Sequence, residues 1–205
     1  VDTAAPSAPT VAAITDDTGT ASDGITSDNQ LVITGTAEAN ASVEVFIDAG
    51  SIGTTTADGS GNWSYDHSGN TLADGGYAIT AAATDASGNT SATSSALNIT
   101  VDTAAPSAPT VAAITDDTGT ASDGITSDNQ LIIAGTAEAN ASVEVFIDAG
   151  SIGTATADGS GNWSFDHTGT TLADGSYAIT AAATDASGNT SSTSSALNIT
   201  VDTAA

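Results

Sequence analysis

Acidic side chains are the residues of this sequence that could bind a ligand. The chain carries 25 Asp and Glu residues and no Lys or Arg, so its formal net charge is −25. No carboxylate can form an ordinary salt bridge, and their mutual repulsion has to be offset by ions from solvent or by a bound metal. Ca²⁺ suits this composition, because it takes roughly six to eight oxygen ligands from carboxylates, carbonyls and water.

Other chemistries find less support. Cys is absent, which excludes disulfides and thiolate metal sites. His67 and His167 stand alone in the sequence, so we expect exposed or half-packed imidazoles rather than zinc ligands. The sequence lacks a Gly-x-Ser-x-Gly motif, and a glycosidase pair of carboxylates would need a cleft with aromatic sugar platforms, so we predict that the chain is not an enzyme.

The missing cations also restrict the partners. Without Lys or Arg the chain cannot neutralise nucleic-acid phosphates or bind anionic membranes. No segment is long and apolar enough to predict insertion into a membrane. We therefore predict neither nucleic-acid binding nor membrane insertion.

The sequence consists of two nearly identical repeats. Residues 1–100 align with residues 101–200 without a gap, and they differ at eight positions: Val32/Ile132, Thr34/Ala134, Thr55/Ala155, Tyr65/Phe165, Ser68/Thr168, Asn70/Thr170, Gly76/Ser176 and Ala92/Ser192. Residues 201–205 begin the same motif again. We expect one domain in 1–101 and a second in 102–205, with 201–205 starting the linker to a further repeat of a longer array.

Each repeat has the two-residue periodicity of β-strands. Val43, Val45 and Ile47, for example, alternate with residues expected to face outward. Seven strands are predicted per repeat, near 10–15, 30–36, 42–48, 52–57, 62–67, 77–84 and 93–101. Short strands separated by turn residues predict a sandwich, and Trp63 with a tyrosine corner at Tyr77 favours the immunoglobulin-like type. The predicted fold is all-β: two tandem immunoglobulin-like β-sandwich domains of about seven strands each, end to end.

Strand direction decides which carboxylates can meet. If the seven strands alternate, the loop of residues 16–29 and the turns at Asp48 and Asp74 lie at the C-terminal end of each repeat, and the loops at Glu38, Asp58 and Asp85 lie at the N-terminal end. The linker between repeats joins unlike ends. Five candidate metal ligands are expected to converge at the central junction: Asp17, Asp23, Asp102, Glu138 and Asp185. Asp16 is a further candidate at the same end of the first repeat, and the equivalents at the other ends are Asp2, Glu38, Asp85, Asp116, Asp117, Asp123 and Asp202.

Two alternatives remain open for these carboxylates. Asp and Asn in loops commonly accept hydrogen bonds from their own backbone as Asx turns, which needs no metal. The loop of residues 16–28 could also hold an ion of its own, although it does not follow EF-hand spacing. The segment 58–62 is predicted to be a hairpin turn rather than a calcium loop.

A series of short motifs carries a family resemblance. The motifs are Asp2-Thr-Ala-Ala-Pro6, Asp16-Asp-Thr-Gly19, Asp23-Gly-Ile-Thr26, Gly35-Thr-Ala-Glu38, Gly61-Asn-Trp63 and Asp85-Ala-Ser-Gly-Asn-Thr-Ser91. Together they resemble the bacterial immunoglobulin-like repeats in the extender regions of giant calcium-dependent adhesins that are secreted by type I systems, biofilm adhesins among them. The resemblance covers the whole chain.

The resemblance implies an extracellular stalk on the bacterial cell surface that holds a distal adhesive domain away from the cell. It also implies Ca²⁺ at the domain junctions. The expected partners are the neighbouring repeats of the same chain, and we expect the two-repeat fragment to be monomeric. The alternative is an adhesive module whose loops bind a glycan or a protein.

Overall fold

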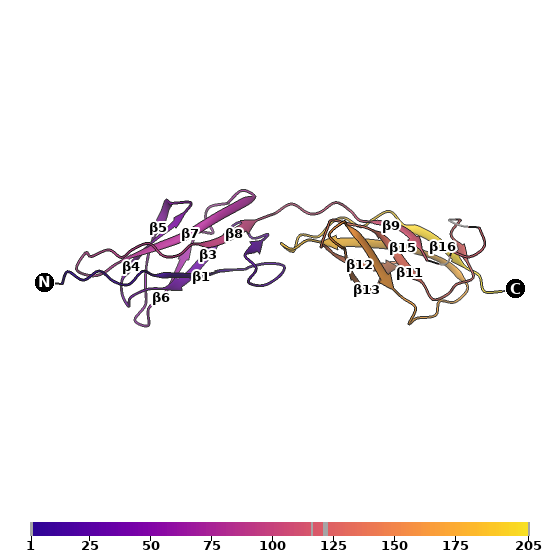
Figure 1. The fold of residues 1–205 in the computed structure, drawn as a ribbon, viewed down its shortest axis with the longest axis horizontal. Helices are drawn as coiled ribbons and strands as arrows, with labels where there is room; N and C mark the ends of the chain where they lie inside the picture. The colour runs from indigo at the N-terminus through magenta and orange to yellow at the C-terminus, as the bar shows by residue number, and fades with distance from the viewer. Residues whose placement is uncertain (1, 116, 121–122, 205) are drawn as a thin grey trace. The chain divides into compact units, whose positions relative to one another are not determined.

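The chain folds into two β-sandwich units. The computed structural model describes residues 2–115, 117–120 and 123–204, and these residues contain strands and turns but no helix, so none of them forms a helix that could cross a membrane. The chain divides into the units Val1–Ala104 and Ala105–Ala205, and each unit is described by itself (Figure 1). The prediction of an all-β sandwich in each repeat is confirmed.

Each unit contains a three-stranded and a five-stranded sheet. The first unit has β1 (Thr10–Thr15), β2 (Ile25–Thr26), β3 (Val32–Thr36), β4 (Ser42–Ile47), β5 (Gly50–Thr56), β6 (Asn62–Asp66), β7 (Gly75–Thr84) and β8 (Leu97–Val101). Its sheets have the orders β1-β3-β6 and β2-β8-β7-β4-β5.

The second unit repeats this architecture. Its strands are β9 (Thr110–Ile114), β10 (Ile125–Thr126), β11 (Ile132–Thr136), β12 (Ser142–Ile147), β13 (Gly150–Thr156), β14 (Asn162–Asp166), β15 (Gly175–Thr184) and β16 (Leu197–Val201). Its sheets have the orders β14-β11-β9 and β10-β16-β15-β12-β13.

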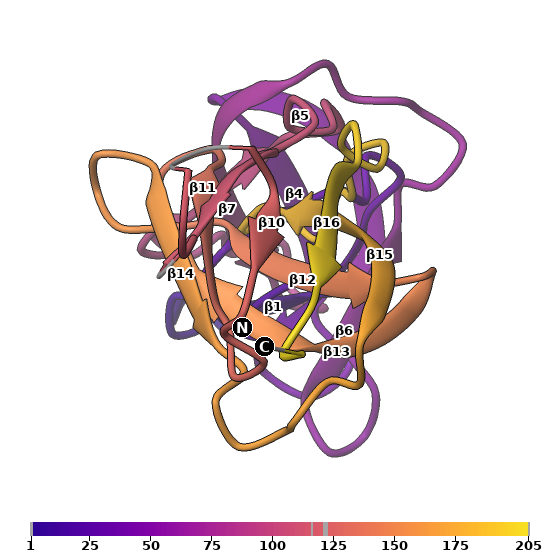
Figure 2. The same ribbon diagram turned by 90° about the vertical axis from the view of Figure 1, so that its right-hand side faces the viewer.

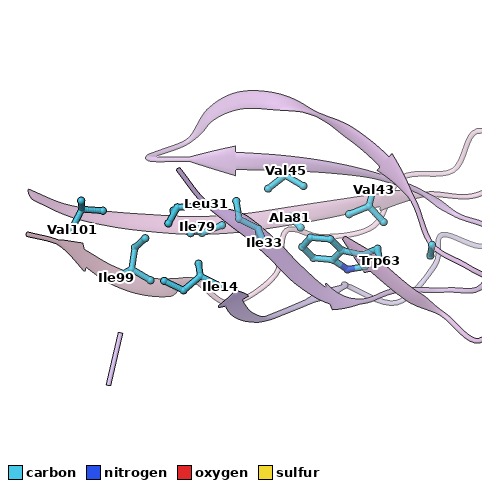
Figure 3. Packing of buried hydrophobic residues seen from close by; sticks show 11 residues of the cluster. Ile14, Leu31, Ile33, Val43, Val45, Trp63, Ile79, Ala81, Ile99 and Val101 are labelled. Carbon is cyan, nitrogen blue, oxygen red and sulfur yellow. The ribbon is translucent and has the colours of Figure 1, made fainter. Parts of the chain in front are cut away.

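The core of each unit lies between its two sheets. In the first unit Val43 and Val45 are fully buried, as their two-residue spacing predicted, whereas Ile47 is half-buried. Ile33 is also fully buried, and Trp63 packs among these side chains (Figure 3). The indole is seated against the backbone of Gly35. A Cβ on Gly35 would lie 2.0 Å from the carbonyl oxygen of Thr10 and 2.5 Å from Cζ2 of Trp63, so only glycine fits there.

The prediction of seven strands per repeat missed one short strand. Residues Ile25 and Thr26 form β2, which pairs in parallel with β8. Figure 2 shows its counterpart β10 beside β16. Thr26 is fully buried, and its hydroxyl donates to the carbonyl oxygen of Asp16 (2.9 Å) and accepts from the amide of Asp28 (3.0 Å). A buried hydroxyl therefore fixes the long loop between β1 and β3.

The last strand begins at Leu97, although the sequence predicted a strand from residue 93. The segment before Leu97 still runs beside β7, but two amides of β7 donate to serine hydroxyls of this segment instead of to its backbone carbonyl groups. The amide of Ala81 donates to Oγ of Ser94 (3.0 Å), and the amide of Ala83 donates to Oγ of Ser91 (3.0 Å). Strand geometry is interrupted there because side-chain oxygens complete the ladder.

Two aromatic residues test the sequence reasoning in opposite ways. The tyrosine corner is confirmed, because the hydroxyl of Tyr77 donates to the carbonyl oxygen of Ala73 (2.8 Å), and Tyr177 repeats this bond. The prediction for His67 was wrong, because its side chain is buried against the ring of Tyr65, with ring centroids 6.2 Å apart. His167 is half-buried, as expected.

Candidate functional site

The acidic loops of the first unit lie at the ends that strand direction predicted. At the C-terminal end, Oδ1 of Asp48 accepts from the amide of Ala78 at the start of β7 (2.9 Å). The amide of Asp102 donates to the carbonyl oxygen of Thr26 (2.9 Å). The loop of residues 16–28, the β4–β5 turn and the first residue after β8 therefore share one end of the unit.

The opposite end of the first unit holds Asp2 and Asp85. The side-chain amide of Asn89 donates to Oδ2 of Asp85 (2.8 Å) and to the carbonyl oxygen of Asp2 (3.3 Å). One asparagine thus joins two of the predicted ligand residues. Glu38 lies on an exposed turn, where it lines a hollow of about 330 Å³ with Ser7.

The carboxylates of the 16–28 loop have different surroundings. Asp16 is exposed and adopts a positive φ of 65°. Asp23 forms an Asx turn, in which Oδ1 accepts from the amide of Ile25 (2.8 Å). Asp17 is half-buried, and its Oδ2 lies 3.5 Å from the amide of Gly24.

Asp17 is the carboxylate that best fits a metal ligand. Its Oδ1 is buried and has no hydrogen-bond partner in the structure. Asp17 also lines a cavity of about 110 Å³, together with Ser22, Gly24 and the apolar residues Ile14 and Ile99. A buried carboxylate oxygen without a donor is costly, so the cavity has the chemistry of a place for water or a cation.

The corresponding loop of the second unit is described in part. Oδ1 of Asp123 accepts from the amide of Ile125 (2.9 Å), which repeats the turn at Asp23. Asp117 is half-buried, as Asp17 is. The predicted ligand Asp116 lies outside the described residues.

The aspartates at equivalent positions 2, 102 and 202 of the repeating sequence all make the same local turn. Oδ1 of Asp2 accepts from the amide of Ala4 (3.0 Å), and Asp102 and Asp202 bind the amides of Ala104 and Ala204 in the same way (3.1 Å each). These are the Asx turns of the metal-free alternative. An Asx turn engages one carboxylate oxygen, so it orients the group and does not by itself prevent coordination through the other oxygen.

Asp85 and Asp185 are held more tightly. Oδ1 of Asp85 accepts from the amides of Ser87 and Asn89 (2.8 Å each), and the side chain of Asn89 holds Oδ2. Asp185 makes the equivalent bonds to the backbone and side-chain amides of Asn189 (2.8 and 3.0 Å). The side-chain and backbone amides of Asn89 lower the pKa of Asp85 below its ordinary value. At Asp85, amide donors thus stabilise the ionised carboxylate, as Lys and Arg side chains commonly do in other proteins.

The candidate ligands are divided between the two ends of each unit. Among residues 2–115, 117–120 and 123–204, no three His, Asp or Glu side chains gather where they could hold a metal ion. Within the first unit Asp2 lies near Asp85 through Asn89, and Asp102 is tied to the 16–28 loop through Thr26. Asp17 and Asp85 belong to opposite ends of this unit. A calcium site would therefore need carbonyl and hydroxyl oxygens or carboxylates of a neighbouring repeat.

Sequence reasoning missed a contact that holds the chain as it leaves each unit. Oδ1 of Asp74 accepts from both the amide (3.0 Å) and the hydroxyl (2.8 Å) of Thr103, and Asp174 binds Thr203 in the same way (2.9 and 2.8 Å). The sequence placed Asp74 at this end but gave no reason to pair it with a residue 29 positions away. The identical spacing in both repeats is the only signal that could have suggested it.

The fold of each unit agrees with the comparisons with known proteins. The sequence model of the bacterial Ig-like domain family matches residues 4–103 and again residues 105–203. The fibronectin(III)-like modules of Clostridium thermocellum CbhA are similar in fold, with a TM-score of 0.51, 18% identity and 93% coverage of both chains. Among curated proteins, no sequence matches the chain significantly.

Two further structures of adhesins are similar at lower TM-scores. One is a 1.5-MDa bacterial ice-binding adhesin, at a TM-score of 0.46 and 25% identity over 97% of this chain and 66% of that chain. The other is a tetra-tandem repeat in the extending region of a large adhesion protein, at a TM-score of 0.38 and 26% identity over 87% of this chain and 47% of that chain. The two family matches together span nearly the whole sequence, and the chain belongs to the bacterial Ig-like domain family as two tandem copies.

Proposed function

We propose that this chain is a spacer segment of an extracellular bacterial adhesin, secreted to the cell surface, whose repeats hold a distal adhesive domain away from the cell. The observation that carries the proposal is that the first unit fixes its two chain ends at opposite ends of the sandwich. In the first unit Asn89 holds Asp2 at one end, and Asp74 holds Thr103 at the other. Every added repeat of this kind lengthens the array by about one sandwich, roughly 40 Å for strands of this length with their loops.

The same proposal assigns no catalytic role to the chain. Its polar side chains are engaged in turns and strand edges, as at Asp58, whose Oδ1 accepts from the amides of Ser60 and Asn62 (2.8 and 2.9 Å). Residues 58–62 form a turn, but the predicted hairpin is wrong, because the strands that this turn joins, β5 and β6, belong to different sheets and do not pair. A repeated spacer needs length, which tandem repeats supply, and stiffness within each unit, to which such locally satisfied turns contribute.

Ca²⁺ is the proposed stiffener of the junction. Asp16, Asp17, Asp23 and Asp102 would supply ligands from the first repeat and its linker, and Glu138 and Asp185 from the second. The ion would add positive charge to a chain with a net charge of −25, where carboxylates from two repeats would otherwise repel each other. The buried, unpartnered Oδ1 of Asp17 and the closeness of Asp2 to Asp85 support this assignment.

Small-angle X-ray scattering of the two-repeat chain, first in excess EDTA and then in millimolar CaCl₂, tests the calcium proposal. Calcium should change the profile from that of a broad ensemble to that of a single extended particle. Asp185→Asn should reduce this response, because it removes a charged ligand at the junction. Asp85→Asn is the matched control, because it makes the same change at the end of the first repeat that does not face the second.

Superimposable profiles with and without calcium would overturn the proposal of a calcium-stiffened junction. Equal losses from Asp185→Asn and Asp85→Asn would overturn the assignment of Asp185 as a junction ligand. A glycan array separates the spacer from the adhesive alternative, because reproducible sugar binding by the two-repeat chain would favour a module that binds through its loops.

A further inference from the structure

The segment after the last strand of each repeat is fastened to its own unit. Thr103 donates both its amide and its hydroxyl to a single oxygen of Asp74, at 3.0 and 2.8 Å. One residue earlier, the amide of Asp102 donates to the carbonyl oxygen of Thr26 in β2 (2.9 Å). The chain is therefore held at two successive residues after β8 ends at Val101.

The second unit shows the same fastening independently. The amide and hydroxyl of Thr203 donate to Oδ1 of Asp174, at 2.9 and 2.8 Å, and the amide of Asp202 donates to the carbonyl oxygen of Thr126 (2.9 Å). The two donors of Thr203 lower the pKa of Asp174 below its ordinary value. Because the arrangement recurs with the same atoms, it is a property of the repeat.

The segment that opens each repeat is fastened to the unit that follows it. Pro6 and Pro9 are buried in the first unit, which has no repeat before it in this sequence, so their own sandwich covers them. Pro106 and Pro109 occupy the same positions of the second repeat and are also buried. The boundary between the units falls between Ala104 and Ala105.

These contacts leave very little free chain between the repeats. Thr103 is bound on the side of the first repeat and Pro106 is buried on the side of the second, so only Ala104 and Ala105 lie between the two anchors. Ala104 is further restricted because its amide donates to Asp102 (3.1 Å). A linker this short has little conformational freedom.

We propose that Asp74 and Thr103 form a latch that fixes the direction in which the chain leaves the first repeat, and that this latch confines bending between the repeats to Ala104 and Ala105. Asp74 is a positioning residue in this role. The latch goes beyond the calcium proposal because it consists of hydrogen bonds within one unit and needs no metal. An array would then keep part of its stiffness when calcium is removed.

Spin-label distance measurements in EDTA test the latch. The sequence has no Cys, so Ser60→Cys and Ser160→Cys place one label in each repeat at equivalent exposed turns. Asp74→Ala should broaden the distribution of distances between the labels, because the free segment lengthens to include Thr103, while the amide of Asp102 stays bound to the carbonyl oxygen of Thr26. Asp74→Asn should keep the narrow distribution, since its amide oxygen still accepts both hydrogen bonds.

Asp174→Ala is the matched control. It breaks the same latch at a position that does not lie between the two labels, so the distribution should stay as in the unsubstituted chain. A distribution for Asp74→Ala that superimposes on that of the unsubstituted chain would overturn the latch. Equal broadening by Asp174→Ala would also overturn it, because the effect would then come from general loosening of a repeat.

Amide hydrogen exchange, measured by NMR in EDTA, tests the bond itself. The amide of Thr103 should exchange about tenfold faster in Asp74→Ala, as expected for the loss of a hydrogen bond to a charged group. The amides of β7 and β8 should be unchanged, which shows that the unit stays folded. Unaltered exchange at Thr103 would contradict the proposal. Because no calcium is present, either result leaves the calcium proposal to be decided by its own experiment.

Discussion

The two repeats close one flank of their sandwiches in different ways. In the first repeat, side chains join the edge strands β5 and β6, which belong to different sheets. Oγ1 of Thr55 donates to the carbonyl oxygen of Ser64 (2.8 Å), and the hydroxyl of Tyr65 donates to the carbonyl oxygen of Ile52. In the second repeat Ala155 and Phe165 replace Thr55 and Tyr65, so both donors are missing.

The aromatic ring itself is packed alike in both repeats. A Cβ on Gly53 would meet the hydroxyl of Tyr65 at 2.3 Å, and one on Gly153 would meet Cε2 of Phe165 at 2.6 Å. The difference therefore lies in hydrogen bonds rather than in the core. This comparison shows that the flank formed by β5 and β6 differs between the repeats, whereas the acidic residues proposed as calcium ligands are the same in both repeats.

The largest expected effect comes from breaking one repeat and sparing the other. Gly35→Ala should destabilise the first repeat by about 3 kcal/mol, because the new Cβ meets the carbonyl oxygen of Thr10 and the indole of Trp63 and neither can withdraw easily. The second repeat should keep its stability, since repeats of an array contribute nearly additively. Urea denaturation followed by hydrogen exchange and mass spectrometry assigns the loss to one repeat.

Gly59→Ala is the control for this prediction. A Cβ on Gly59 meets nothing within 4 Å, so this variant should unfold with the unsubstituted chain. Equal urea midpoints of the first repeat in Gly35→Ala and Gly59→Ala would contradict the close packing of Trp63 on Gly35.

The next effect sharpens the comparison of the flanks. The double variant Thr55→Ala and Tyr65→Phe gives the first repeat the flank of the second, and it should lose about 2 kcal/mol, or about 1 kcal/mol for each hydrogen bond. The reciprocal variant, Ala155→Thr with Phe165→Tyr, should stabilise the second repeat by a similar amount. Urea midpoints of the two repeats measure both changes. Reciprocal variants that both destabilise would show that each flank is adapted to its own repeat.

Acid should act on both repeats together, because their turns are the same. The backbone amides of Asn62 and Ser60 lower the pKa of Asp58, and Asn162 and Ser160 do the same for Asp158. A carboxylate whose folded-state pKa is lowered contributes stability above its ordinary pKa of about 3.9, and this contribution is lost as the pH falls through the folded-state value. From neutral pH down to about pH 4, the fall in net charge acts in the opposite direction by relieving repulsion.

Stability should therefore rise from pH 7 to about pH 4 and fall below that. Urea midpoints across this range measure the profile. Asp58→Asn keeps an acceptor that does not titrate, so its first repeat should lose less stability below about pH 4 than the unsubstituted repeat does. A steady decline from pH 7 downward would contradict the account of repulsion among unpaired carboxylates.

The sequence revealed the long-range plan of the fold better than its local fastenings. Residue alternation, as in β4 and β7, identified the strands, and the assumption that consecutive strands run in opposite directions then placed each acidic loop at one end of the unit. The unpredicted strand β2, which is parallel to β8, does not change these placements. A strand of two residues shows no periodicity, so β2 could not be predicted. Thr26 and Thr103 could not be recognised either, since a hydroxyl that fixes a loop looks like any surface threonine until the partner is known.

The smallest predicted effect concerns the exposed pair at the start of β7 and β15. Oγ of Ser176 lies 3.2 Å from Oγ1 of Thr200, its cross-strand neighbour, whereas the first repeat has Gly76 opposite Thr100. A Cβ on Gly76 would have only an ordinary contact, at 3.9 Å from the carbonyl oxygen of Ile99. Gly76→Ser should stabilise the first repeat by about 0.5 kcal/mol, because it removes the flexibility of glycine from a strand and adds a hydroxyl pair.

Ser176→Gly should cost the second repeat a similar amount, and a shift in the urea midpoint of each repeat measures both. Comparing Gly76→Ala with Gly76→Ser separates the backbone contribution from that of the hydroxyl pair, because alanine reduces the flexibility of the unfolded chain but adds no hydroxyl contact. If Gly76→Ala stabilises as much as Gly76→Ser, the backbone accounts for the whole effect and the hydroxyl pair contributes nothing. If only the serine stabilises, the hydroxyl pair of Ser176 and Thr200 gives the second repeat some of the stability that its flank lacks. The difference in unfolding free energy between the repeats is then smaller than the two missing flank hydrogen bonds alone would make it.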